Sequence, residues 1–154
     1  MTYEEYKRSR QSEFDNLPIF FAFSDEQFEK EMNKHGLTGK DTKKVYGMGN
    51  GGFYLKKDAH IIHDFLNKKD ALPELMQNED FAEDAFLYEM FNHELCYNSQ
   101  GAWDVCSCFG NCEYGDGKTS MDYLKEMGYG EKTIKAYRRA KARYYDKVSE
   151  WEVV

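Results

Sequence analysis

One histidine and four cysteines in the middle of the chain have side chains that bind transition metals. They are His93, Cys96, Cys106, Cys108 and Cys112. Four nitrogen or sulfur ligands complete a tetrahedral structural zinc site, and such a site stabilises a loop that has few other bonds. The spacing differs from the paired C-x2-C of zinc ribbons and fingers, so buried free thiols are the competing interpretation. A subset of these five residues is therefore the candidate zinc site, and no other cofactor is expected.

The same cysteines could act as nucleophiles beside a histidine. Cys106 or Cys108 could pair with His93 or His63, but this catalysis requires contact in space, which sequence spacing does not show. The sequence contains no nucleophile elbow and no protease motif. His60 and His63 lie one helical turn apart without a third ligand, which favours solvated or core histidines. The protein is therefore expected not to be an enzyme, and a small Cys/His enzyme is the second alternative.

The charge is distributed unevenly along the chain. Residues 70–117 contain eleven carboxylates and no Lys or Arg, whereas residues 125–147 contain eight Lys or Arg and three carboxylates. Attraction between the two segments within the fold would explain this division. The acidic segment could instead imitate the phosphate backbone of nucleic acid and bind a basic groove of another protein.

Five acidic residues on the central predicted helix are the candidate partner-binding surface. They are Glu79, Asp80, Glu83, Asp84 and Glu89. The expected partner is a host protein, for example a nucleic-acid-binding effector. Direct binding of nucleic acid is not expected, because the core-facing stripe of the basic C-terminal helix explains its aromatic residues. An ordinary solvated helix face is the competing interpretation of the acidic run.

The elements that must position these residues are mainly helical. The expected fold is α+β and mainly α, with five or six helices and a small antiparallel sheet or hairpin. Capping residues, periodicity and helix-ending glycines predict the helices. The longer helices are expected over residues 2–17, 24–36, 58–68, 78–95 and 131–151, and shorter ones over 70–77 and 120–127. Residues 19–23 and 45–55 are expected to form the sheet.

A glycine-rich stretch, residues 47–52, matches the G-x-G-x-x-G of dinucleotide-binding folds. That motif requires a strand before it and a helix after it. Here Asn50–Gly51 favours a tight turn, and Phe53–Leu55 predicts a strand. A hairpin is therefore predicted instead of a dinucleotide site.

The length of 154 residues fits one domain, and no linker or repeat divides the sequence, so a single domain over residues 1–154 is expected. No apolar run reaches the ~18 residues of a membrane span, and the N-terminal segment lacks the apolar core of a secretory signal. Four cysteines without such a signal favour a reducing compartment. A cytoplasmic protein without membrane contact is therefore expected.

Two segments carry a family resemblance: FAEDAFLYEMFNHELCYN at residues 81–98 and DYLKEMGYGEKTIKAYRRAKARYY at residues 122–145. They resemble a family of small uncharacterised proteins of Gram-positive bacteria of the Firmicutes type, often encoded on phages and other mobile elements. Shorter matching segments are Ile19–Phe23, Tyr46–Leu55, Trp103–Val105 and Cys108–Gly110. The resemblance covers nearly the whole chain and implies a genomic setting, but no biochemical activity.

The NHE motif within this resemblance provides a candidate polar site. Asn92, His93 and Glu94 form the motif, and Trp103 and Asp104 are grouped with it. Polar residues at the end of an apolar helix suit either a buried hydrogen-bond network or a binding site. The resemblance implies that not every cysteine belongs to the family pattern, and Cys96, Cys106 and Cys112 are the three that depart from it. This departure weakens the zinc hypothesis.

The function expected from these features is that of a non-enzymatic accessory protein of a phage or mobile element. Such a protein would bind and modulate a host macromolecule through its acidic surface, as a defence antagonist of the anti-CRISPR or anti-restriction type. Small size, acidic charge and the absence of a catalytic motif favour this function, together with the genomic setting of the family. A structural zinc-binding protein is the first alternative.

Overall fold

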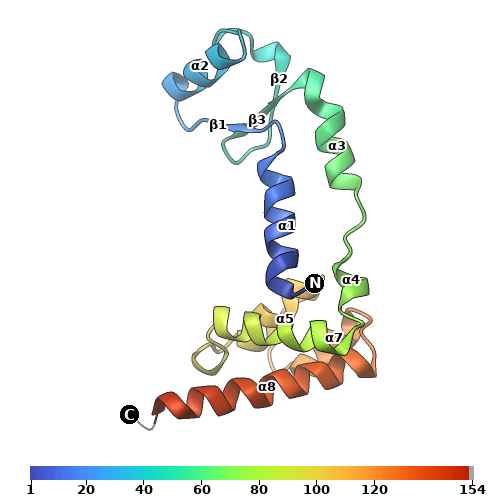
Figure 1. The fold of residues 1–154 in the computed structure, drawn as a ribbon. Helices are drawn as coiled ribbons and strands as arrows, with labels where there is room; N and C mark the ends of the chain where they lie inside the picture. The colour runs from blue at the N-terminus through green and yellow to red at the C-terminus, as the bar shows by residue number, and fades with distance from the viewer. Residues whose placement is uncertain (153–154) are drawn as a thin grey trace. The chain divides into compact units, whose positions relative to one another are not determined.

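The computed structural model of the chain describes residues 1–152, and Figure 1 shows its ribbon. Contact density divides the chain into two compact units. The larger unit contains residues 1–9 and the chain from Asp70 onward, and the smaller unit contains residues 10–69. Helix α1 (Tyr3–Asp15) contributes residues to both units. The single domain stays a prediction, because contact density does not show whether the two units unfold together.

The predicted fold class, α+β and mainly helical with a small antiparallel sheet, is confirmed. Residues 1–152 contain eight α-helices, slightly more than the expected five or six. The short helix α4 (Leu72–Leu75) lies within the predicted range 70–77, and α6 (Gly101–Cys106) is an addition. The 3-10 helices in this range are η1 (Thr42–Lys44), η2 (Lys56–Asp58), η3 (Leu95–Tyr97) and η4 (Ser107–Phe109). No helix among the described residues has the length and apolar character needed to cross a membrane.

The smaller unit contains a three-stranded antiparallel sheet. Its strands are β1 (Phe20–Phe21), β2 (Val45–Gly47) and β3 (Gly52–Leu55), with β3 in the centre. The hairpin between β2 and β3 uses Gly49 and Gly51 at φ angles of 83° and 84°, where a side chain would be strained. The predicted hairpin is thus confirmed. A strand follows the glycines where a dinucleotide site would need a helix.

Two helices, α2 (Asp25–Lys34) and α3 (Ala59–Asn67), complete the smaller unit. Ser24 begins α2 as predicted, because its side chain accepts a hydrogen bond from the backbone N–H of Gln27. The buried residues that join α2 to the sheet are Phe20, Met32 and Leu55. The sheet and α2 therefore share one small hydrophobic core.

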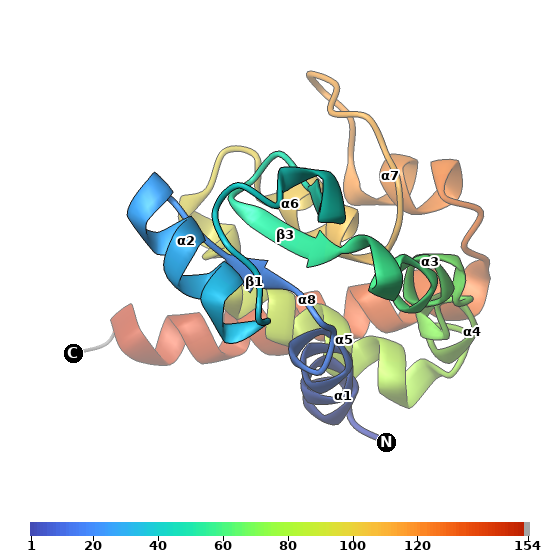
Figure 2. The same ribbon diagram turned by 90° about the horizontal axis from the view of Figure 1, so that it is seen from above.

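The larger unit is organised around α5 (Glu79–Asn92) and α8 (Glu131–Glu152), which lie side by side in Figures 1 and 2. Asn78 begins α5 by accepting a hydrogen bond from the N–H of Phe81. The buried residues of α5 form two adjacent rows one turn apart, residues 81, 85 and 89 and residues 82, 86 and 90. Such a wide buried face lets α5 contact other elements besides α8.

The two rows of α5 meet different neighbours. Phe86 packs edge-on against the rings of Phe109 and of Tyr137 in α8, with centroids 4.8 and 5.1 Å apart. Phe81, in the other row, packs edge-on against Tyr3 at the start of α1. The N-terminal turns of α1 thus cover the row that also contains residue 89.

The segment between α5 and α7 (Ser120–Glu126) contains α6 and two of the 3-10 helices, η3 and η4. The chain leaves α5 through Glu94, whose φ of 50° is left-handed. Asn98 donates hydrogen bonds to the backbone carbonyl of His93 and to the Asp104 carboxylate. Trp103 Nε1 donates to the carbonyl of Cys112 at 3.0 Å. These bonds hold α6 and η4 against the end of α5.

Candidate metal centre

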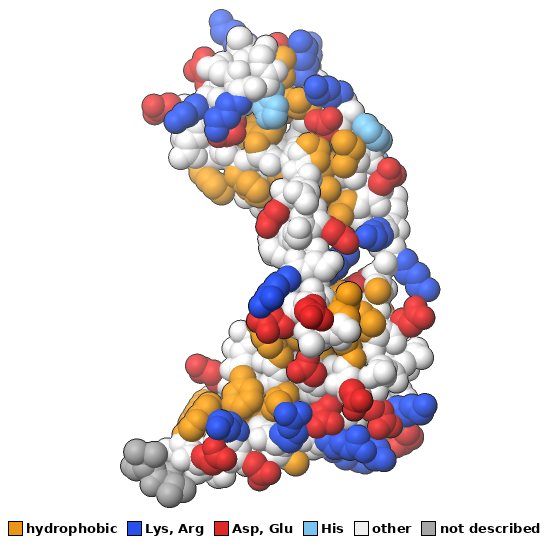
Figure 3. Space-filling view, in the orientation of Figure 1, with side chains coloured by type: hydrophobic (Ala, Val, Ile, Leu, Met, Phe, Trp, Pro, Cys, Tyr) orange, Lys and Arg blue, Asp and Glu red, His pale blue; other side chains and the backbone are white. Residues whose placement is uncertain are grey.

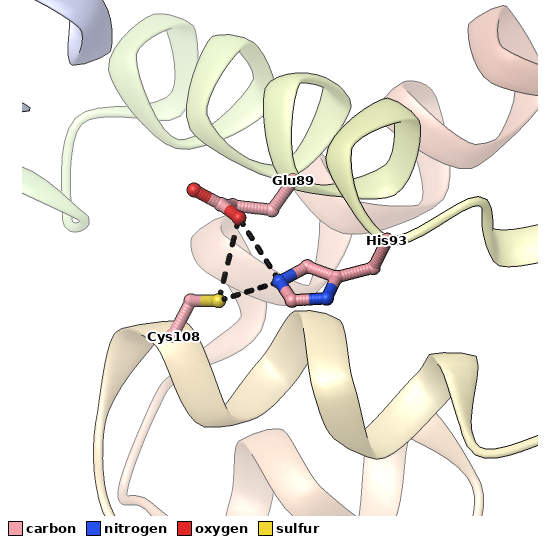
Figure 4. A group of neighbouring side chains, drawn as sticks. All are labelled: Glu89, His93 and Cys108. Atoms are coloured by element: carbon pink, nitrogen blue, oxygen red, sulfur yellow. Dashed lines mark hydrogen bonds and ion pairs between the residues drawn. The ribbon is translucent and has the colours of Figure 1, made fainter.

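Three side chains of the types that bind transition metals converge in the larger unit. Glu89 and His93 lie one turn apart on α5 and at its C-terminal cap, and Cys108 lies in η4 (Figure 4). Cys108 Sγ is 3.4 Å from both Glu89 Oε2 and His93 Nε2, and these two atoms are 3.3 Å apart. Their ligand atoms therefore form a nearly equilateral triangle.

The local structure explains why these side chains meet. A spacing of four residues places Glu89 and His93 on the same face of the helix. Glu89 shares its row with Phe81 and Ala85, so its side chain enters the core and the residue is only 1% exposed. Cys108 follows α6, and its Sγ lies 3.3 Å from the backbone carbonyl of Asp104, which fixes the thiol.

The two oxygens of Glu89 have separate partners. Oε1 accepts hydrogen bonds from Tyr3 Oη and Lys7 Nζ, each at 2.9 Å. Oε2 faces Cys108 and His93 and accepts a bond from Asn92 Nδ2 at 3.2 Å. Tyr3 and Lys7 thus orient the carboxylate, as outer partners of metal ligands commonly do.

The environment shifts the pKa values of two of the three candidate ligands, Glu89 and Cys108, in opposite directions. Burial raises the pKa of Glu89, but the hydrogen bonds from Lys7, Tyr3 and Asn92 outweigh it, so the net pKa lies below the usual value. Burial, together with the negative charge of Glu89, raises the pKa of the Cys108 thiol to about 12. At neutral pH without a metal, the carboxylate is therefore ionised and the thiol is protonated. A protonated thiol is a poor nucleophile, which disfavours a cysteine nucleophile here.

A Tyr3→Phe substitution is expected to lower the free energy of unfolding by about 1.5–3 kcal/mol, because it removes a buried hydrogen bond to a charged group. It is also expected to weaken metal binding by about tenfold, since Glu89 loses an orienting partner. Urea unfolding and a metal titration measure the two effects. The control is Tyr88→Phe, since Tyr88 is 40% exposed and its ring packs against Tyr3. Equal effects of the two substitutions would contradict the orienting role of Tyr3.

The separations in the triangle fit a bound metal ion. Zinc lies about 2.3 Å from a thiolate sulfur and about 2.0–2.2 Å from imidazole nitrogen or carboxylate oxygen. At tetrahedral angles, these bond lengths place the ligand atoms about 3.3–3.6 Å apart. The distances between Glu89, His93 and Cys108 are 3.3, 3.4 and 3.4 Å. No other group of three such side chains within residues 1–152 brings its ligand atoms comparably close.

The remaining cysteines of the predicted zinc set lie outside the triangle. Cys96 Sγ accepts a hydrogen bond from Tyr144 Oη at 3.1 Å, and Cys106 is completely buried beside the carbonyl of Ser120. Burial raises the pKa of the Cys106 thiol to about 12, so it stays protonated. Cys112 is partly buried, and its carbonyl accepts the bond from Trp103. The predicted set therefore contributes only His93 and Cys108 to the site.

The candidate polar residues have different positions. Asn92 and His93 both contact Glu89, so two of the three residues of the NHE motif lie at the candidate metal centre. Glu94 is exposed at the turn after α5. Trp103 and Asp104 hold the following loop through side-chain hydrogen bonds. Asn92, Trp103 and Asp104 therefore take part in partly buried hydrogen bonds, and whether the group also binds a ligand stays a prediction.

The candidate acidic surface is largely engaged within the fold. Glu79 pairs with Arg139 at 3.3 Å and Glu83 with Arg143 at 3.2 Å, which matches the expected attraction between the acidic and basic segments. Figure 3 shows acidic and basic side chains intermingled over this part of the molecule.

The other members of the acidic set differ in exposure. Asp84 is exposed and accepts a hydrogen bond from the N–H of Tyr3, and Asp80 is also exposed. Glu89 is a correction to the expected surface, because its burial in the core leaves it no contact area for a partner. Binding of a partner through the remaining carboxylates stays a prediction.

Neither Glu89 as a candidate ligand nor Tyr3 and Lys7 as its partners was predicted from the sequence. The spacing Glu89-x3-His93 could have indicated the first, because residues four apart share a helix face. No sequence pattern could have indicated the other two, which precede Glu89 by more than 80 residues.

Comparisons with known proteins give a family but no activity. No curated protein and no solved structure matches the chain. Residues 2–144 match a protein family whose function is unknown, so the match covers nearly the whole chain, as the sequence resemblance implied. The chain therefore belongs to the family of unknown function DUF7659.

Proposed function

We propose that the protein binds one divalent transition-metal ion of the zinc type at Glu89, His93 and Cys108. The observation that carries this proposal is the triangle of ligand atoms with sides of 3.3, 3.4 and 3.4 Å. One thiolate, one imidazole and one carboxylate are all common zinc ligands. The thiolate and the carboxylate together balance the charge of a divalent ion.

Hydrogen bonds alone do not satisfy all the polar atoms around the Cys108 thiol. The Cys108 thiol has one proton, yet Glu89 Oε2, His93 Nε2 and the Asp104 carbonyl all lie within 3.4 Å of its sulfur. A thiol is also a weak donor and a weak acceptor. A cation in the centre of the triangle would instead interact favourably with all three side chains at once.

The ligand count supports a site with one open coordination position. Three protein ligands leave the fourth position of a tetrahedral ion to water or another molecule. The His93 side chain is 31% exposed, so solvent reaches this edge of the site. Structural zinc sites have four protein ligands, whereas three are typical of sites that bind or activate a further molecule. The expected absence of enzymatic activity stays a prediction.

Metal analysis of protein purified without added metal tests the proposal. We expect close to one zinc ion per chain, and a cobalt-substituted protein should show thiolate-to-cobalt charge-transfer absorption. Because Cys108 must release its proton to bind the ion, apparent zinc affinity should rise by about tenfold per pH unit from this group alone, at pH values below the thiol pKa of about 12. Protein that neither contains zinc nor binds added zinc or cobalt would contradict the proposal.

The setting of the protein on a phage or mobile element and its action on a host macromolecule stay predictions. They derive from the family resemblance and from the acidic charge. The ion pairs of Glu79 and Glu83 with α8 and the burial of Glu89 reduce the number of free carboxylates available to a partner. The metal centre is for this reason the function that the geometry supports best.

A further inference from the structure

The smaller unit contains a pocket whose lining surface is mainly apolar and whose lining residues, all from that unit, include four exposed lysines and one histidine. Its volume is about 320 Å³, and it lies between the end of α2, η1 and η2. The polar lining side chains are those of His35, Lys43, Lys44, Lys56 and Lys57. The apolar lining side chains are those of Leu37 and Leu55, which also pack in the core of this unit.

The pocket lysines have no carboxylate partners. No described Asp or Glu forms an ion pair with Lys43, Lys44, Lys56 or Lys57. Other lysines of the same unit are paired, Lys34 with Glu31 at 2.8 Å and Lys68 with Glu13 at 3.0 Å. Lys30, Lys40 and Lys69 of this unit also form no described ion pair, so the pocket lysines differ from them by lying around one cavity.

The sequence around the pocket also has little negative charge. Residues 34–58 contain six lysines and only two carboxylates, Asp41 and Asp58. The Asp41 carboxylate accepts a hydrogen bond from the backbone N–H of Thr38 at 2.8 Å and a second from its hydroxyl. The bond from the Thr38 backbone is the main cause that lowers the pKa of Asp41, and Lys44 adds to it. Two carboxylates, of which Asp41 is engaged in its own turn, cannot neutralise four ammonium groups.

Short helices position the lysines around the pocket. Lys43 and Lys44 lie in η1, and Lys56 and Lys57 lie in η2. The Lys56 ammonium lies 4.9 Å from the centre of the Tyr46 ring, a cation–π contact. Figure 3 shows both basic and acidic side chains on the visible face of this unit. A local excess of lysines over carboxylates creates a positive potential that attracts anions.

We propose that this pocket binds a small organic polyphosphate of the nucleoside triphosphate class. The phosphates would contact the lysines, because an ammonium group binds phosphate as a compact point charge. The apolar part of the ligand would lie against Leu37 and Leu55. The volume of about 320 Å³ is at the lower end of small-molecule pockets, about 300–1,000 Å³. The lysines surround one cavity and do not form a long stripe, which favours a small ligand over a nucleic acid.

Calorimetric titration of the full chain with ATP tests this proposal. The protein is first passed over a chelating resin, so that no metal ion at Glu89 bridges to the phosphates. We expect saturable binding that is weakened by about tenfold or more in a Lys44→Ala/Lys56→Ala variant. The matched control is Lys30→Ala/Lys69→Ala, which removes the same charge from exposed positions of the same unit and should change binding by less than about twofold.

Three further probes show which part of ATP contributes to the affinity and whether a nucleic acid binds instead. They are adenosine, inorganic tripolyphosphate and a short single-stranded oligonucleotide. We expect ATP to bind more tightly than tripolyphosphate, and adenosine to bind weakest. Absence of saturable ATP binding would overturn the proposal, and so would equal losses in the two double variants. An oligonucleotide that binds more tightly than ATP would also overturn it and identify a nucleic-acid surface. None of these results depends on metal binding at Glu89, His93 and Cys108.

Discussion

A Cys108→Ser variant is expected to bind zinc at least about 100-fold more weakly than the unchanged protein. Loss of an outer partner of a metal ligand alone costs about 10–100-fold in affinity, and Cys108 is proposed as a direct ligand. Serine is close to cysteine in size, but its hydroxyl does not ionise at neutral pH. The variant therefore loses one ligand and one of the two negative charges that balance the ion. Competition against a zinc-binding dye measures the affinity.

The matched control for this substitution is Cys112→Ser. Cys112 belongs to the zinc set predicted from sequence, but the ligand triangle does not include it. It is partly buried, so serine is tolerated there better than at the fully buried Cys106. The Cys112→Ser protein should retain zinc affinity within about twofold, and its cobalt form should keep the thiolate absorption. If Cys112→Ser lost zinc and Cys108→Ser retained it, the ligand assignment would be wrong.

A Phe86→Ala variant is expected to lose about 3–5 kcal/mol of the free energy of unfolding of the larger unit. Phe86 is completely buried, and its ring packs edge-on against Phe109 and Tyr137. The substitution removes the buried ring and the two aromatic contacts, and it leaves a cavity between α5, η4 and α8. Urea unfolding followed by circular dichroism measures the change, because most helices of the protein lie in this unit.

The control for Phe86→Ala is Tyr97→Ala, an aromatic-to-alanine change in the same unit. The Tyr97 residue is 72% exposed, so the substitution should change stability by less than about 0.5 kcal/mol. A loss below about 1 kcal/mol for Phe86→Ala would show that the packing of α5 against α8 is not the core of the larger unit. Loss of zinc binding by a folded Phe86→Ala protein would show that the packing also positions Glu89, one turn further along α5.

The sequence by itself determined the elements whose causes are local. Ser24 and Asn78 begin their helices through hydrogen bonds to residues three positions later, so a short window contains the whole interaction. The hairpin at residues 47–52 depends on glycines that adopt positive φ within the turn itself. The fold class and the attraction between the acidic and basic segments also followed from patterns along the chain. His93 and Cys108 were named as metal ligands by residue type.

Only the tertiary structure showed which carboxylate lies beside His93 and Cys108. The five acidic residues of α5 were assigned to one surface from sequence, and although Glu89 shares its row with Phe81 and Ala85, the row does not show which elements cover it. Glu79 and Glu83 turn to the arginines of α8, while Glu89 enters the core. A buried carboxylate is stable there only because Tyr3 and Lys7, more than 80 residues earlier, donate hydrogen bonds to it. Contacts between residues so far apart depend on how α1, α5 and η4 pack, and local sequence does not encode that packing.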